Sequence, residues 1–116
     1  MPLNEAEREV CEVIITGGDA DWLTDFTRRL VEARLAACGH ISTPIRSIYR
    51  WAGAVRDEPE ARVALHTRRS LVPRIVRRTD EEHAYEVPCV IAVPIVAGNP
   101  DYTQWILDST DPPGTA

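Results

Sequence analysis

The sequence predicts one α+β domain of the ferredoxin-like type, in which strands and helices follow the order βαββαβ and a further helix closes the chain. This prediction rests on four segments with strand-like patterns and on helical spacing between and after them. It also rests on size, because 116 residues with 44% hydrophobic and 27% charged side chains can bury one core. We expect the domain to span residues 10–110, with a flexible segment at 1–9 and a disordered tail at 111–116.

The first strand and the first helix follow the N-terminal segment. Residues 10–16 form a β-rich apolar run that ends in a glycine pair. A helix should begin directly after it, because Asp19 or Asp21 can accept hydrogen bonds from the amides of the first turn. Gly39 is expected to end this helix. Its apolar stripe recurs at helical spacing and consists of Trp22, Phe26, Leu30, Ala33 and Ala37.

The middle of the chain predicts a β-hairpin. Residues 45–51 alternate between apolar and polar side chains, and Gly53 marks the turn that follows. Residues 60–67 alternate again, so the two segments should pair. Asp57–Pro59 is expected to interrupt or bulge the ladder, since proline lacks the amide that a ladder needs.

A second helix and a last strand follow the hairpin. Ser70 is expected to cap the helix, with Pro73 in its first turn and an acidic loop at residues 80–82 after it. Residues 87–96 are apolar on both faces, which a strand at the open edge of a sheet does not tolerate. We therefore expect another surface to cover this strand. Asn99 should cap the closing helix that presents Tyr102, Trp105 and Ile106 on one side.

Composition excludes several classes of function. Acidic residues outnumber basic residues by 18 to 13, and the net charge of −5 opposes binding to nucleic acid or to anionic membranes. Every basic residue is arginine, so Schiff-base chemistry by a lysine is excluded. Three cysteines without a C-x-x-C pair indicate neither a disulfide framework nor a zinc knuckle. Together with the lack of a long apolar run, this predicts a protein of the reducing cytoplasm.

Six short motifs follow one another along the chain. They are Leu35-Ala36-Ala37-Cys38, Tyr49-x-Trp51-x-Gly53, Glu60, His83-Ala84-Tyr85-Glu86-Val87-Pro88, Gly98-Asn99-Pro100-Asp101-Tyr102 and Gln104-Trp105. Their order and spacing resemble the CutA family of divalent-cation tolerance proteins over roughly residues 10–109. The resemblance implies ferredoxin-like subunits in a tight homotrimer, linked in bacteria to tolerance of copper and other divalent cations. The uncovered strand at residues 87–96 independently favours a partner surface.

The resemblance also implies where metal ions bind. In some family members a cysteine at the end of the first strand and a pair of histidines bind copper, and the corresponding residues here are Ile15, Glu82 and His83. His83 is thus the one ligand retained for copper or another divalent cation. Useful affinity normally needs three or four convergent ligands, so His83 alone would form a weak site.

A second departure concerns the cleft between subunits, where a lysine and a glutamate are usual in the family. This chain has His66 and Cys89 there, two softer metal ligands or a Cys/His couple. Neutral packing explains the same pair, so both interpretations remain open. The residues predicted to line the cleft are Cys38, Tyr49, Trp51, Glu60, His66, Tyr85, Cys89 and Trp105. Aromatic residues in such positions are more often interface anchors, and Cys38 also fits a small buried side chain.

Three functions follow from these patterns. The first is a trimeric protein that binds or responds to copper or another divalent cation without catalysis. The second is a signalling or scaffold trimer whose cleft between subunits binds a small molecule or a segment of a partner. The third is an enzyme with Cys89 as nucleophile and His66 as base, which is disfavoured because the sequence identifies no third group to orient the base. We therefore predict a tolerance protein that is not an enzyme.

Overall fold

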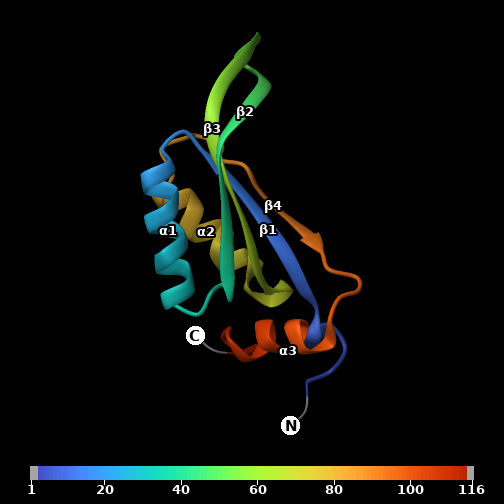
Figure 1. Ribbon diagram of the computed structural model, residues 1–116. Coiled ribbons are helices and arrows are strands. Elements are labelled where there is room, and N and C mark those ends of the chain that lie inside the picture. The colour runs from blue at the N-terminus through green and yellow to red at the C-terminus, as the bar shows by residue number, and fades with distance from the viewer. Residues whose placement is uncertain (1–2, 115–116) are drawn as a thin grey trace.

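The computed structural model describes residues 3–114 and contains a four-stranded sheet with three α-helices (Figure 1). The elements, in chain order, are β1 Val10–Gly17, α1 Ala20–Glu32, β2 Cys38–Trp51, β3 Ala54–Arg68, α2 Val72–Glu82, β4 Val90–Pro94 and α3 Pro100–Asp108. Two short 3-10 helices, η1 Ala6–Arg8 and η2 Arg69–Leu71, precede β1 and α2. The predicted order βαββαβ with a closing helix is confirmed.

The sheet has the strand order β2-β3-β1-β4, and every neighbouring pair is antiparallel. Helices α1 and α2 cover one face, while α3 lies across one end of the sheet (Figure 1). Because side chains alternate along a strand, Val13 and Ile15 of β1 enter the core beneath the helices. Glu12, Ile14 and Thr16 are half-buried on the opposite side, which we call the open face of the sheet.

Helix α1 begins as predicted and ends earlier than predicted. The carboxylate of Asp19 accepts hydrogen bonds from the amides of Asp21 and Trp22, which confirms the N-cap. The helix ends at Glu32, and Arg34 adopts a positive φ of 62°. The prediction that Gly39 ends the helix is wrong, because Gly39 lies in β2.

Gly39 instead allows β2 to approach α1 closely. A Cβ atom at this position would lie 2.5 Å from Cγ2 of Thr27 and 3.0 Å from Cδ2 of Leu65. Such separations are below ordinary van der Waals contact, so a larger residue would have to push the helix away from the sheet. The glycine is thus required by packing, and the backbone needs no unusual conformation there.

Strands β2 and β3 form the predicted hairpin, but the irregularity lies on the other strand. The register shifts between Ser42 and Ile45 of β2, beside the cis Thr43–Pro44 peptide bond, whereas Asp57–Pro59 continues the ladder. The predicted interruption at Asp57–Pro59 is therefore wrong. Pairing of β3 with β1 ends at Ala61, so at Pro59 strand β3 pairs with β2 and no longer with β1. This part of β3 tolerates proline as an edge strand does.

The second half of the chain differs from the prediction at three boundaries. Ser70 lies in η2 and α2 begins after Leu71, so the predicted cap is wrong, although Pro73 does occupy the first turn. Residues 80–82 extend α2 instead of forming a loop, and Glu82 in this last turn accepts hydrogen bonds from Arg29 and Arg78. Strand β4 spans five residues, fewer than the predicted 87–96. The Asn99 cap of α3 is confirmed.

Both ends of the described chain contact the domain. Glu9 pairs with Arg69 at 2.6 Å, and the amide of Asp111 donates to the carbonyl of Arg34 at 3.0 Å. The sequence predicts a flexible segment at 1–9 and a disordered tail at 111–116. Parts of both segments, residues 1–2 and 115–116, lie outside the described residues. Among the helices described, none combines the length and the apolar composition that a membrane crossing requires.

Candidate functional site

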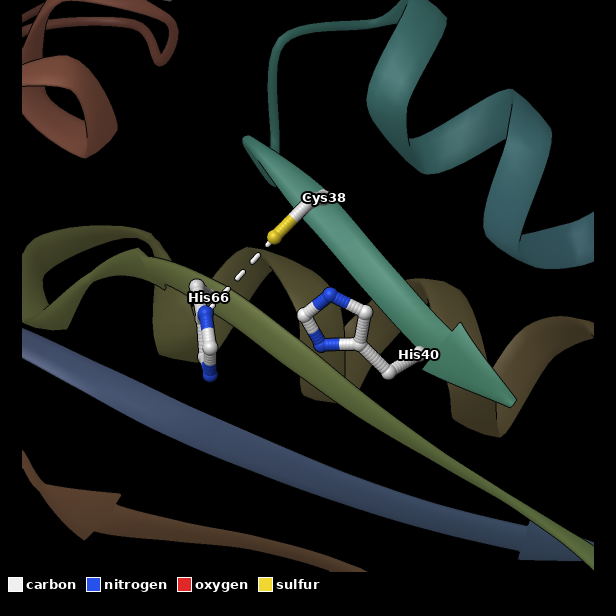
Figure 2. Close-up of side chains that lie close together, drawn as sticks. All are labelled: Cys38, His40 and His66. Atoms are coloured by element: carbon white, nitrogen blue, oxygen red, sulfur yellow. Dashed lines mark hydrogen bonds between the residues drawn. The ribbon is translucent and has the colours of Figure 1, made fainter. Parts of the chain in front are cut away.

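Three metal-ligating side chains converge where β2 begins and β3 ends (Figure 2). One donor atom each from Cys38, His40 and His66 lies within 4.8 Å of the other two. Cys38 pairs with His66 across the ladder and His40 is two residues further along β2, so all three belong to the open face. We call these three residues the Cys38 cluster.

His66 is held on both sides by hydrogen bonds. Its Nε2 lies 2.9 Å from Oε2 of Glu12 on β1, and its Nδ1 lies 2.5 Å from the hydroxyl oxygen of Tyr102 on α3. Because an ionised carboxylate can only accept, Nε2 carries the proton and donates to Glu12. In the neutral ring Nδ1 then accepts from the hydroxyl of Tyr102.

Cys38 completes this network. Its Sγ lies 3.4 Å from the hydroxyl oxygen of Tyr102 and 3.6 Å from Nδ1 of His66. The thiol can therefore donate to the hydroxyl oxygen while that hydroxyl donates to the imidazole. Burial raises the pKa of Tyr102 to about 12, and the hydrogen bond with Cys38 contributes to the shift. Tyr102 is accordingly a neutral hydroxyl at physiological pH.

The donor set of the Cys38 cluster selects a class of ion. One sulfur and two imidazole nitrogens match the ligands of zinc and copper, whereas magnesium and calcium prefer oxygen. Glu12 holds the second ring nitrogen of His66, as carboxylates do behind histidine ligands. Tetrahedral ligands lie roughly 3.5 Å apart, so the donors must close by about 1 Å. His40 is exposed and has room to move.

The position of His83 favours a structural role over the predicted metal ligand. Its Nε2 lies 2.7 Å from the carbonyl oxygen of Thr16, and its Nδ1 accepts from the amide of Tyr85 at 3.0 Å. Both ring nitrogens are thus engaged with backbone. The other two positions of the copper set implied by the resemblance are a buried core residue, Ile15, and an ion-paired carboxylate, Glu82.

The predicted couple of His66 and Cys89 is not formed within the chain. His66 lies opposite Glu12 of β1, whereas the pairing of Val90 with Ile15 places Cys89 beside Thr16. Four residues along a strand correspond to about 13 Å. The thiol near His66 is that of Cys38, and the third group that orients the imidazole is Glu12.

The predicted cleft residues form two separate groups. Five of them line a groove of about 690 Å³ at the hairpin, namely Tyr49, Trp51, Glu60, Tyr85 and Cys89. In this groove Glu60 is buried and accepts a hydrogen bond of 2.6 Å from the hydroxyl of Tyr85. Burial, followed by this hydrogen bond, raises the pKa of Tyr85. Cys38 and His66 lie at the other end of the sheet, and Trp105 packs beside Tyr102 with ring centroids 5.5 Å apart.

Sequence reasoning placed Cys38 and His66 in one cleft, but it did not predict that they form a metal-ligating cluster with His40 or a network with Glu12 and Tyr102. The signal that was available is the i, i+2 spacing of Cys38 and His40, which places both on one face of a strand. The spacing was not recognised because α1 was predicted to continue to Gly39, which assigned Cys38 to the end of a helix instead of a strand.

The relatives found by comparison with known proteins agree in name with the family model that matches the chain. The family model described as CutA1 divalent ion tolerance protein matches residues 11–109. The divalent-cation tolerance protein CutA of Thermus thermophilus is 36% identical over 98 residues, which are 84% of this chain and 95% of that protein. Protein CutA of Mus musculus is 39% identical over 75% of this chain, and the match spans about half, 49%, of that longer protein.

Solved structures share the fold. A divalent cation tolerance protein (Cut A1) from T. thermophilus superposes with a TM-score of 0.85 and 34% identity, covering 88% of this chain and 99% of that one. CutA1 from Oryza sativa superposes with a TM-score of 0.87 and 31% identity, covering 92% and 98%. Fold and sequence thus point to the same relatives.

Proposed function

Because the chain belongs to the CutA1 divalent ion tolerance protein family, we propose that it acts in divalent-cation tolerance by binding copper or another divalent cation, without catalysis. The observation that carries the proposal is the convergence of one thiol and two imidazoles within 4.8 Å in the Cys38 cluster. The names of the relatives describe tolerance of divalent cations, which supports a function that involves such cations.

The side chains around the cluster have separate tasks in this proposal. Cys38 supplies a thiolate once a cation displaces its proton, and His40 and His66 supply neutral nitrogens. Glu12 keeps the ring of His66 in one orientation and places a negative charge near the cation. All three cysteines are free thiols, which suits the reducing cytoplasm where we place this function.

We further propose that the working form is a homotrimer. On β4, at one edge of the described sheet, Ile91 and Val93 are 53% and 46% exposed. At the hairpin, which projects beyond the rest of the sheet (Figure 1), Ile48 and Val55 are 67% and 63% exposed. Two different apolar surfaces on one chain favour head-to-tail contacts, and such contacts can close into a ring.

Sedimentation equilibrium at micromolar concentration tests the assembly. We expect a single species with three times the mass of one chain. A folded monomer would contradict the homotrimer, and the cation-binding proposal would then rest on the Cys38 cluster of a single chain.

Isothermal titration calorimetry with Zn(II) and Cu(II) tests the cation-binding function. We expect the wild-type protein to bind at least one of these ions with a Kd below about 10 µM. The variant Cys38→Ser should lose this affinity. The variant Cys89→Ser should retain it, which distinguishes the two thiols. Binding that is absent from the wild type would contradict the proposal, as would binding that depends on Cys89 and not on Cys38.

The groove at the hairpin favours a second candidate function, a scaffold or signalling trimer that binds a small molecule or a peptide segment. Buried Glu60 and the rings of Tyr49, Trp51 and Tyr85 line this groove and offer a carboxyl anchor among aromatic side chains. A thermal-shift screen with amines, nucleotides and metabolites tests this candidate, since a ligand of the native state raises the melting temperature. A hit that Glu60→Gln abolishes would support it.

A further inference from the structure

We propose that a thiophilic divalent cation enters the Cys38 cluster by displacing the hydroxyl of Tyr102 from Nδ1 of His66, which makes Tyr102 a gate on the metal site. This inference rests on the cation-binding function proposed above. It identifies the hydroxyl of Tyr102 as the group that competes with the metal for His66. It also describes how metal binding at the Cys38 cluster would affect helix α3.

The ring of His66 offers a single nitrogen to a metal. Its Nε2 donates to Glu12 at 2.9 Å, and this bond points away from Cys38 toward β1. Its Nδ1 lies 3.6 Å from Sγ of Cys38, so this nitrogen faces the cluster. A cation that is bound by both Cys38 and His66 must therefore use the lone pair of Nδ1.

The hydroxyl of Tyr102 already uses that lone pair. The hydroxyl oxygen lies 2.5 Å from Nδ1 and 3.4 Å from Sγ of Cys38, so it contacts both donor atoms. A metal ion needs both donors at about 2.0–2.3 Å. Since one lone pair serves one partner, the hydrogen bond from Tyr102 and the metal bond exclude each other.

The exchange balances in protons and charge. The hydroxyl of Tyr102 leaves with its own proton, and the thiol of Cys38 releases its proton to solvent when the thiolate coordinates. The thiolate and the carboxylate of Glu12 together offset the two positive charges of the ion. Sulfur and imidazole donors bind zinc, copper or cobalt in preference to magnesium and calcium.

Release of Tyr102 links the site to α3. Tyr102 lies in the first turn of this helix, three residues after the Asn99 cap, and its ring centroid is 5.5 Å from that of Trp105. Loss of the bond to His66 removes a hydrogen bond that joins this turn to β3. Trp105 is 42% exposed, so movement of the neighbouring ring changes a surface that another molecule can reach.

The variant Tyr102→Phe tests the gate because it keeps the ring and removes the hydroxyl. Zn(II) affinity is measured by competition with a chromophoric chelator, and Co(II) absorption reports whether a thiolate remains among the ligands. Since the lost hydrogen bond competed with the metal, we expect Zn(II) to bind about 2- to 10-fold more tightly, with the cobalt–thiolate band retained. A role limited to stabilising the fold would weaken binding instead.

Thr103→Val is the matched control, because Thr103 is the next residue of α3 and its hydroxyl donates to the carbonyl of Pro100. This variant should leave Zn(II) affinity unchanged. Unchanged or weaker Zn(II) binding by Tyr102→Phe would overturn the gate while leaving the cation-binding function in place. Failure of the wild-type protein to bind Zn(II), Cu(II) or Co(II) would overturn both.

Wild-type tryptophan fluorescence supplies an independent measurement. Zn(II) should change the emission in the wild type, because Tyr102 moves beside Trp105, and the change should be lost in Trp105→Phe. A metal-bound wild type whose emission equals that of the metal-free protein would contradict the displacement.

Discussion

The hydroxyl oxygen of Tyr102 lies 2.5 Å from Nδ1 of His66, and this contact joins α3 to the open face of the sheet. The polar network around it takes one side chain from each of four elements: Cys38 from β2, Tyr102 from α3, His66 from β3 and Glu12 from β1. Residues far apart in the sequence thus meet at one point. If the Cys38 cluster binds a cation as proposed, its affinity should be sensitive to changes in any of the four elements.

Glu12→Gln should weaken Zn(II) binding by about 10-fold or more, because carboxylates behind histidine ligands typically contribute that much. The amide keeps the size of the side chain and removes the charge that holds Nε2 of His66. Competition titration measures the change. Glu32→Gln, at the exposed end of α1, is the control and should bind like the wild type. Equal affinity of the Glu12 variant would remove Glu12 from the site.

Arg68→Met should destabilise the fold by about 1–3 kcal/mol, since it removes two buried hydrogen bonds that join β3 to the C-terminal end of α3 and to Thr110 just after it. The buried guanidinium donates to the carbonyl of Leu107 at 2.6 Å and to Oγ1 of Thr110 at 3.0 Å. Urea unfolding measures the free-energy change. Arg77→Met, on the exposed side of α2, should cost less than about 0.5 kcal/mol. A similar small cost for Arg68 would show that these two hydrogen bonds contribute little to the stability of the fold.

Glu82→Gln should lower thermal stability at neutral pH and lose this effect in acid. Burial acts to raise the pKa of Glu82, but hydrogen bonds from Arg29 and Arg78 outweigh it, and the pKa is lowered. A lowered carboxyl pKa stabilises the fold above the ordinary value of about 4.3, and the stabilisation disappears as the pH falls through the lowered pKa. Melting curves at neutral and strongly acidic pH check this. A difference that persists unchanged in acid would contradict the ion-pair explanation.

Two of the three thiols, those of Cys11 and Cys38, should react differently with iodoacetamide. Burial raises the pKa of Cys11 to about 11, against a smaller opposing effect of Arg69, so this thiol should react only after unfolding. Cys38 is partly buried and should be protected by added Zn(II), which converts it into a metal ligand. Peptide mass spectrometry after timed alkylation measures each site. Zinc-independent labelling of Cys38 would argue against coordination by its sulfur.

Much of the fold is predictable because its signals are local. The alternation in β2 and β3 and the caps at Asp19 and Asn99 depend on neighbouring residues, and all are confirmed. The end of α1 is not local. Ala33 and Ala37 continue the helical spacing of α1, yet the amide of Ala37 donates to the carbonyl of His66, and this tertiary contact starts the pairing of β2.

The candidate site was predictable only in part. The resemblance singled out His66 as an unusual residue, and the structure places it at the centre of the polar network. Its partner was assigned to Cys89, because the register between β1 and β4 that separates these residues is set by contacts across the sheet. Tyr102 approaches from a helix whose docking no local pattern encodes.

Anomalous diffraction from crystals grown with Zn(II) tests the metal site most directly. We predict one strong peak about 2.0–2.3 Å from Sγ of Cys38, a ring nitrogen of His40 and Nδ1 of His66, with the hydroxyl of Tyr102 moved out of hydrogen-bonding distance. A fully occupied zinc ion bound elsewhere, with the contact between Tyr102 and His66 intact, would contradict the account.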